Sequence, residues 1–352
     1  MDLENKLKMR KIFKNLKFLS IIILNYGLPT IAPLILLIFF SSQIPISIIQ
    51  KQAEFNIFLN IAFNILFFRY DIRVKEKKNL NLSFFSTLIF LLISLFYFSY
   101  ESILPVFIFI LGNSSMHKNS HGLALKKYRF LFGLFQTILI LSAVFFKIYD
   151  LIIYSYGLSF LAFCFLKEKV YITNRYLSFS AVKKQIIPSF ISIYLFFPTI
   201  LILLGNLDYK GEQIIELKIA NIFGLLANHV VFDIASSKRI KKLHYLRLLY
   251  YSLILLVCFP FGIYFIEFFM YYDISITRIL LFLVLSIISV AILFFSRRLQ
   301  VLNTIEAFKF DTFRVITCFF VLLLFILNQS IFFSLFILYC ANLIYLLCKK
   351  IY

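Results

Sequence analysis

The chain has 352 residues, of which 62% are hydrophobic, 19% aromatic and only 15% charged, and its formal net charge is +20. This composition excludes an ordinary soluble domain, which needs more polar surface, and predicts a membrane protein. A helix that crosses the hydrocarbon layer takes about 20 apolar residues, and apolar runs of roughly that length recur along the chain. We therefore expect an all-α polytopic membrane protein.

Twelve apolar segments are predicted to be transmembrane helices. They cover residues 19–40, 55–68, 82–100, 103–116, 130–146, 151–166, 186–204, 214–235, 248–270, 276–296, 313–328 and 331–347. The first follows a basic stretch, but it is too long for the apolar part of a signal peptide and no small-residue cleavage site follows it. The fourth, "ILPVFIFILGNSSM", contains a proline and fades early, so a re-entrant segment is the alternative there.

The basic residues give an independent test of this count, because Lys and Arg concentrate on the cytoplasmic side of a membrane. With the N-terminus inside, all but five of the 36 Lys and Arg residues lie in the tails and alternate loops that would be cytoplasmic. The exceptions are Lys51, Lys147, Lys210, Lys218 and Arg278. This alternation predicts that both termini are cytoplasmic, and it explains the positive charge without a nucleic-acid partner.

The two halves of the sequence resemble each other. "NIFLNIAFNILF" from Asn56 aligns with "NIFGLLANHVVF" from Asn221, and at the same offset "PLILL" at Pro33 meets "PTILI" at Pro198. "ALKKYRF" before the fifth helix resembles "AFKFDTF" before the eleventh. Such a repeat predicts two six-helix lobes. Their bounds are 1–170 for the N-lobe, 171–184 for a basic cytoplasmic linker and 185–352 for the C-lobe.

These features resemble those of a known family of carriers. Two six-helix halves, a proline in helices one and seven, and basic loops before helices five and eleven are similar to the polysaccharide-exporter branch of the multidrug/oligosaccharidyl-lipid/polysaccharide (MATE-like) flippase superfamily. "LNTIEAFKFDTFRVITCFFVLLLFIL" and "GEQIIELKIANIFGLLANHVVFDI" carry the local likeness, although "GEQIIELKI" replaces the small, Gly-rich residues usual at the start of helix eight. The likeness extends over essentially the whole chain.

The resemblance implies both a mechanism and a cargo. It implies a central cationic cavity between two lobes that opens alternately to the two sides of the cell inner membrane. The expected substrate is an undecaprenyl-pyrophosphate-linked oligosaccharide repeat unit for O-antigen (lipopolysaccharide) or capsule synthesis. Membrane lipids, a polymerase and other polysaccharide-assembly proteins are the expected partners, and nucleic acid is not.

Polar residues inside the predicted helices indicate which faces turn away from lipid. Asn56, Asn60 and Asn64 recur every fourth residue and therefore share one helix face. We expect such groups to line the cavity. The candidate cavity residues are Asn25, Tyr26, Thr30, Asn56, Asn60, Asn64, Lys218, Asn221, Asn228, Arg278 and Arg314, and His229 and Asp233 are candidates for carrying a coupling proton.

Each candidate also has a structural interpretation. The asparagines could form hydrogen bonds between the helices of one lobe, and the basic residues, Lys147 among them, could be anchors at the membrane interface. Asp233 lies close to "SSKR" and could be an ordinary interfacial residue.

Motifs for catalysis are missing from the sequence. We find no Walker loop, nucleophile elbow or metal-ligand cluster, and the five cysteines show no CxxC spacing. We therefore expect a carrier that is not an enzyme and has no cofactor or metal. The alternatives are a membrane-embedded enzyme of the same pathway, either an O-antigen polymerase or an acyltransferase, and a small-molecule exporter.

Overall fold

The structure is a computed structural model. It describes residues 28–40, 43–67, 70, 81–119, 124–166, 170–173, 186, 189–205, 210–220, 275–302, 304–328 and 330–348.

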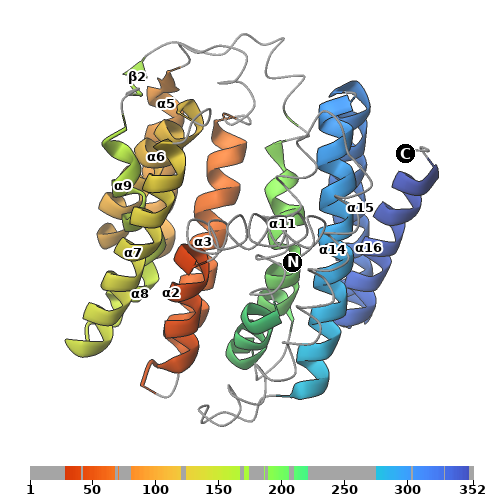
Figure 1. Cartoon of the computed structure of the whole chain (residues 1–352), viewed down its shortest axis with the longest axis horizontal. Coiled ribbons are helices and arrows are strands. Elements are labelled where there is room, and N and C mark those ends of the chain that lie inside the picture. Colours follow the sequence, from red (N-terminus) through yellow and green to blue (C-terminus); the bar gives the residue numbers. More distant parts are fainter. Residues whose placement is uncertain are drawn as a thin grey trace, which may run out of the picture.

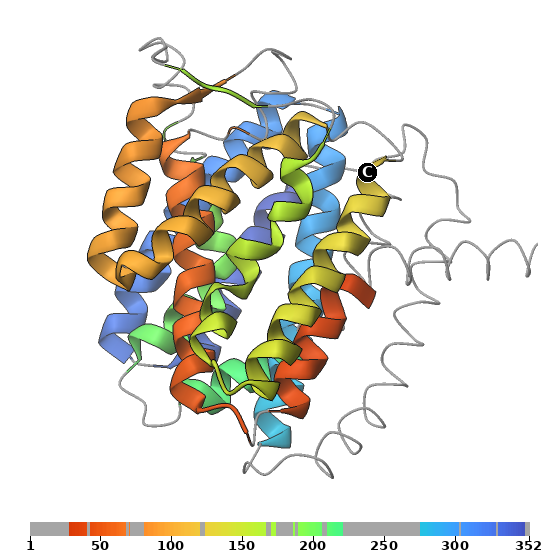
Figure 2. The ribbon, with the colours of Figure 1, turned by 90° about the vertical axis from the view of Figure 1, so that its left-hand side faces the viewer.

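The N-terminal part of the described chain forms one group of helices, which we call the N-group (Figures 1 and 2). Its helices are α2 (Leu28–Phe39), α3 (Ile46–Leu66), α5 (Phe84–Phe98), α6 (Ile103–Lys118), α7 (Ala124–Phe145), α8 (Asp150–Ser159) and α9 (Leu161–Cys164). A 3₁₀ turn, η2 (Tyr100–Ser102), joins α5 to α6. Helices α3 and α6 pack against α8, and α2 packs against α7.

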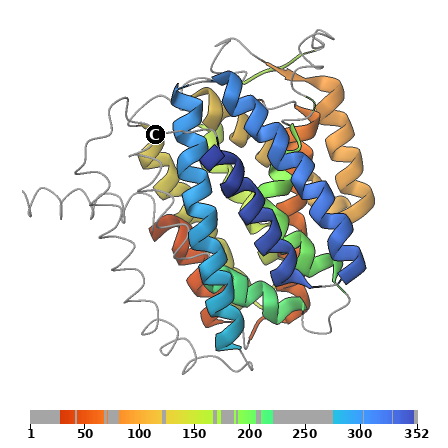
Figure 3. The ribbon, with the colours of Figure 1, turned by 90° about the vertical axis from the view of Figure 1, so that its right-hand side faces the viewer.

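The C-terminal part forms a second group, the C-group (Figures 1 and 3). It contains α11 (Ile191–Leu204), a helical segment at residues 210–220, α14 (Ile276–Leu302), α15 (Thr304–Asn328) and α16 (Ile331–Cys348). Both α11 and α14 pack against α15 and α16. Between the two groups, the main helix contact among the labelled elements is that of α3 with α11.

Two short strands are the exception to the all-α expectation. β1 (Leu82–Ser83) and β2 (Ile172–Thr173) form a parallel pair, and the amide of Leu82 donates to the carbonyl of Tyr171 at 2.9 Å. The pair lies at the upper end of the N-group in Figure 1, where the basic loops of the sequence are predicted to be cytoplasmic.

The hydrophobic side chains form two cores. One extends through the C-group and includes N-group residues such as Leu37 near the end of α2, Ile44 just before α3 and Ile152 near the start of α8. The end of α2 and the start of α3 lie at the lower end of the N-group in Figure 1. The other belongs to the N-group alone and includes Phe63 and Phe109. The two groups of helices therefore share a core at the lower end, while the N-group has a core of its own toward the upper end.

Among the described residues, three helical segments are long and apolar enough to cross a membrane: Ile276–Ser296, Lys309–Asn328 and Ile331–Cys348. Shorter apolar helices cover Phe84–Phe98, Phe130–Phe145, Asp150–Cys164 and Ile191–Leu204. The chain thus has the character of a helical membrane protein. The ninth predicted helix, residues 221–235 of the eighth and residues 19–27 of the first lie outside the described residues, so the count of twelve stays a prediction.

Several helix boundaries differ from those expected. Helix α3 begins at Ile46, nine residues before the predicted start at 55, because Ile49, Gln52 and Ala53 find buried positions on one side of about two and a half added turns. Helix α7 starts at Ala124 instead of 130, and α15 starts at Thr304 instead of 313. Helix α6 is a continuous helix, with Pro105 tolerated in its first turn.

Candidate functional site

The three asparagines of α3 differ in their hydrogen bonds: two donate to other groups, and the third has a buried oxygen that accepts no hydrogen bond among the described residues. The side-chain amides of Asn60 and Asn64 donate to the carbonyls one turn earlier, at 2.8 and 2.9 Å. Asn64 also donates to Ser192 Oγ of α11 at 2.5 Å, which links the N-group to the C-group. The buried Oδ1 of Asn56 has no hydrogen-bond partner among the described residues. The stripe therefore combines packing contacts with one available acceptor.

Gln52 continues the same stripe one turn toward the start of α3, and the sequence analysis missed it. Its side chain is 1% exposed. Its Nε2 donates to Ser155 Oγ at 3.4 Å and to the carbonyl of Ile152 at 3.3 Å, both in α8. The four-residue spacing from Gln52 to Asn56 could have revealed it, but the sequence analysis assigned Gln52 to a loop.

Lys218 is the cation at the boundary between the two groups. Its Nζ lies 2.9 Å from Oε1 of Gln52, so the helical segment 210–220 touches α3 through this pair. Within the described chain, no carboxylate forms an ion pair with Lys218. An ammonium group has three donors, and among the described residues this one makes a single hydrogen bond, to a neutral group. Within that part of the chain, two of its donors are left for another acceptor.

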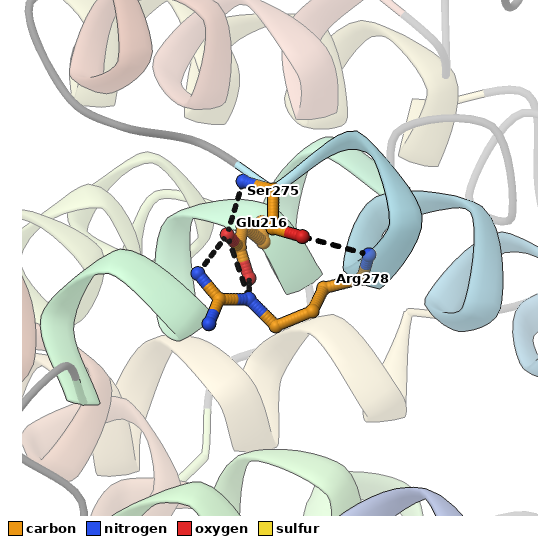
Figure 4. Close-up of polar contacts among 3 residues, drawn as sticks. All are labelled: Glu216, Ser275 and Arg278. Atoms are coloured by element: carbon orange, nitrogen blue, oxygen red, sulfur yellow. Dashed lines mark hydrogen bonds and ion pairs between the residues drawn. The ribbon is translucent and has the colours of Figure 1, made fainter.

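Arg278, by contrast, is fully engaged by a carboxylate (Figure 4). Its Nε and Nη2 donate to Oε2 and Oε1 of Glu216, each at 2.8 Å, and the amide of Ser275 donates to Oε1 at 3.0 Å. The Glu216 side chain is 0% exposed and that of Arg278 is 30% exposed. This bidentate pair joins segment 210–220 to the start of α14, and it leaves Arg278 without free charge for a ligand.

Arg314 lies in the interior of the C-group and not at a helix end. Because α15 starts at Thr304, Arg314 is almost three turns inside the helix and is 3% exposed. Its Nη1 donates to Asp311 Oδ1 at 3.1 Å and to Ser296 Oγ at 3.3 Å. The guanidinium carbon lies 4.0 Å from the ring centre of Tyr194, a cation–π contact with α11.

A cavity of about 290 Å³ adjoins Arg314. Its lining residues come from α11, α14, α15, α16 and, through Leu217, from segment 210–220. Its polar lining residues are Tyr194, Thr199, Ser286, Ser289, Arg314 and Tyr339. Two buried polar atoms of these residues, Arg314 Nε and the hydroxyl of Tyr194, have no hydrogen-bond partner within the described part of the chain. The cavity is thus mainly apolar, with a cation and several hydroxyl groups.

The structure separates the predicted cavity residues. Asn64 and Lys218 lie at the contact between the two groups, whereas Arg278 and Arg314 pair with carboxylates inside the C-group. Lys147, a further basic candidate, is exposed just after α7. Asn25, Tyr26, Asn221, Asn228, His229 and Asp233 lie outside the described residues, as does the side chain of Thr30.

No group of three or more His, Cys, Asp or Glu side chains in the described ranges could hold a metal ion. Comparisons of the chain with protein-family models, with curated proteins and with solved structures give no match. The proposal below therefore depends on the sequence pattern and on the geometry of this site.

Proposed function

We propose that the protein is a flippase that moves an undecaprenyl-pyrophosphate-linked oligosaccharide repeat unit across the inner membrane by alternating access. In this proposal the chain crosses the membrane twelve times, forms two six-helix lobes that contain the N-group and the C-group, and has both termini in the cytoplasm. The unit moves from the cytoplasmic to the periplasmic leaflet.

The observation that carries the proposal is Lys218. A charged side chain inside a membrane protein is costly, and such residues commonly face a cavity or a transport pathway. Lys218 has no carboxylate partner in the described part of the chain, and its contact with Gln52 is a contact between the two groups of helices. A cation in this place suits an anionic cargo, and the pyrophosphate of a lipid-linked sugar supplies both charge and acceptors.

The arrangement of hydrophobic cores supports alternating access. The groups share a core at the end predicted to face the periplasm, and the N-group has a separate core toward the other end. Asn64 and Ser192 meet across the groups near that other end through a polar contact. A contact between groups that combines apolar packing at one end with single polar bonds elsewhere can be broken at modest cost.

The test is the position of the lipid-linked repeat units in a deletion strain. We expect unpolymerised units to accumulate on the cytoplasmic leaflet, where an impermeant periplasmic probe cannot reach them. Units that reach the periplasm and stay unpolymerised would contradict the flippase and favour a polymerase. Normal surface polysaccharide together with altered sensitivity to toxic cations would favour a small-molecule exporter.

A further inference from the structure

The cavity beside Arg314 is separate from the contact between the two groups. All its lining residues belong to the C-group, whereas Lys218 and Asn64 form contacts between the two groups. The cavity holds a buried cation of its own. Its role therefore differs from that of Lys218.

The hydrogen bonds of Arg314 leave one edge of its guanidinium available. Asp311 and Ser296 both bind Nη1, and stacking on Tyr194 fixes the plane of the group. Nε is buried and donates no hydrogen bond to any of the described residues. The Nε and Nη2 hydrogens of arginine form a planar fork that matches two oxygens of a phosphate or carboxylate. A buried donor without an acceptor is costly, so this edge is suited to an anionic ligand.

The hydroxyl of Tyr194 is the second buried group of the cavity for which the described residues provide no hydrogen-bond partner. It belongs to the ring on which Arg314 stacks, so donor and cation lie close together. Ser286 and Ser289 add hydroxyl groups from α14. Asp311 pairs with Arg314 through Nη1 and offsets its charge, so the site offers an anion hydrogen-bond donors and no excess positive charge.

Apolar side chains form the rest of the cavity. Phe196 and Pro198 of α11 and Leu285 and Leu293 of α14 line its walls, and Leu195 at its border is 57% exposed. A volume of about 290 Å³ is near the lower limit for small-molecule pockets. The cavity therefore suits a headgroup and the first part of an apolar chain, with the remainder of the chain passing out between α11 and α14.

We propose that the cavity between α11 and α14 binds the phosphate headgroup and first isoprene units of a polyprenyl phosphate, with the Nε edge of Arg314 and the Tyr194 hydroxyl as donors. The choice of a polyprenyl chain rests on the proposed function. The site binds the lipid carrier within the C-group, and Lys218 remains for the cargo at the contact between the groups.

The test measures binding of farnesyl phosphate, a short polyprenyl phosphate, to the purified full-length protein in nanodiscs made of neutral lipid. Pyrophosphate, farnesol and phosphatidylglycerol serve as comparison ligands. The double variant Asp311→Asn/Arg314→Gln removes the cation and keeps the interior neutral. Leu293→Trp fills the apolar wall. Lys309→Gln is the control, because Lys309 lies in α15, the helix of Arg314, with 58% of its side chain exposed.

We expect the double variant to weaken farnesyl phosphate binding about ten- to a hundred-fold, the cost of losing charge-assisted hydrogen bonds. Leu293→Trp should weaken it as well, and Lys309→Gln should leave it unchanged. Equal binding by the wild type and the double variant would overturn the site. Pyrophosphate or phosphatidylglycerol binding as tightly as farnesyl phosphate would overturn the polyprenyl assignment.

Failure of the binding site and failure of the flippase proposal give different results. Binding through Arg314 in a protein whose deletion leaves repeat-unit export intact would refute the flippase and retain the site. Export that depends on the protein, without binding through Arg314, would refute the site and retain the flippase.

Discussion

The ammonium of Lys218 lies 2.9 Å from the amide oxygen of Gln52, and this hydrogen bond joins the C-group to α3 of the N-group. The other side of the Gln52 amide donates to α8. Gln52 therefore holds the cation in place without neutralising it. Gln52 carries no charge that would offset the ammonium, whereas the carboxylate of Glu216 offsets the charge of Arg278.

The first prediction concerns the charge of Lys218. Lys218→Gln retains a donor for Gln52 and removes the charge, so we expect repeat-unit export to fall at least ~10-fold while protein abundance and melting temperature change little. Lys210→Gln is the matched control, because Lys210 lies in the same helical segment and donates only to the carbonyl of Leu203. Wild-type export by Lys218→Gln would exclude Lys218 from the transport pathway.

The second prediction concerns the unequal exposure of the two partners in the ion pair of Figure 4. Arg278→Gln leaves the carboxylate of Glu216 buried and unpaired, and we expect it to lower the free energy of unfolding by about 3 kcal/mol. Glu216→Gln leaves a cation that is 30% exposed and can be solvated, so the loss should be about 1 kcal/mol.

Thermal unfolding in detergent can measure this asymmetry. The double variant Glu216→Gln/Arg278→Gln should be more stable than Arg278→Gln alone, because it removes the unpaired charge. A double variant that is less stable than either single one would show that the pair is not the source of the effect.

The third prediction separates the asparagines of α3. Asn64→Leu removes the bond to Ser192, and we expect a loss of about 1 kcal/mol. Asn56→Leu removes a buried oxygen that has no partner, so stability should stay the same or rise. If Asn56 binds substrate, this variant should lose export without losing abundance. Equal destabilisation by the two variants would indicate that Asn56 also has a packing role.

The sequence pattern predicted helical segments better than their ends. Every described helix overlaps a predicted one, because long apolar runs are a strong signal. The start of α3 was wrong because Gln50, Gln52 and Glu54 look like loop residues, yet Gln50 bonds to Glu54 one turn later and Gln52 finds partners in α8. Such partners are about a hundred residues away in the chain and leave no local pattern.

The partners of the charged residues could not be predicted from the local sequence either. The sequence identified Lys218, Arg278 and Arg314 as basic residues of predicted helices or their ends, but it could not tell which would be neutralised. The partner of Arg278 is Glu216, 62 positions earlier, and its contact depends on how segment 210–220 meets α14. Arg314 was wrongly placed at a helix end, because polar residues from Thr304 to Thr312 concealed the true start of α15.

The last prediction concerns close packing of α6 against the turn between α8 and α9. A methyl group added at Gly112 would lie 2.8 Å from Cβ of Phe160 and 2.9 Å from its carbonyl carbon. These atoms are close to the backbone and cannot rotate away, so Gly112→Ala should destabilise the protein by about 2–3 kcal/mol. Small residues allow such close approach between helices in membranes.

Gly157 provides the matched control. A methyl group there would lie 3.0 Å from the carbonyl oxygen of Pro105 and 3.4 Å from Cδ1 of Leu59. The contact is tight but can relax by a few tenths of an ångström, and alanine favours the helix by up to about 1 kcal/mol over glycine. We therefore expect Gly157→Ala to melt close to the wild-type temperature and Gly112→Ala well below it. Equal melting temperatures for the two variants would mean that α6 can move away from Phe160, and that this contact does not fix the packing of the N-group.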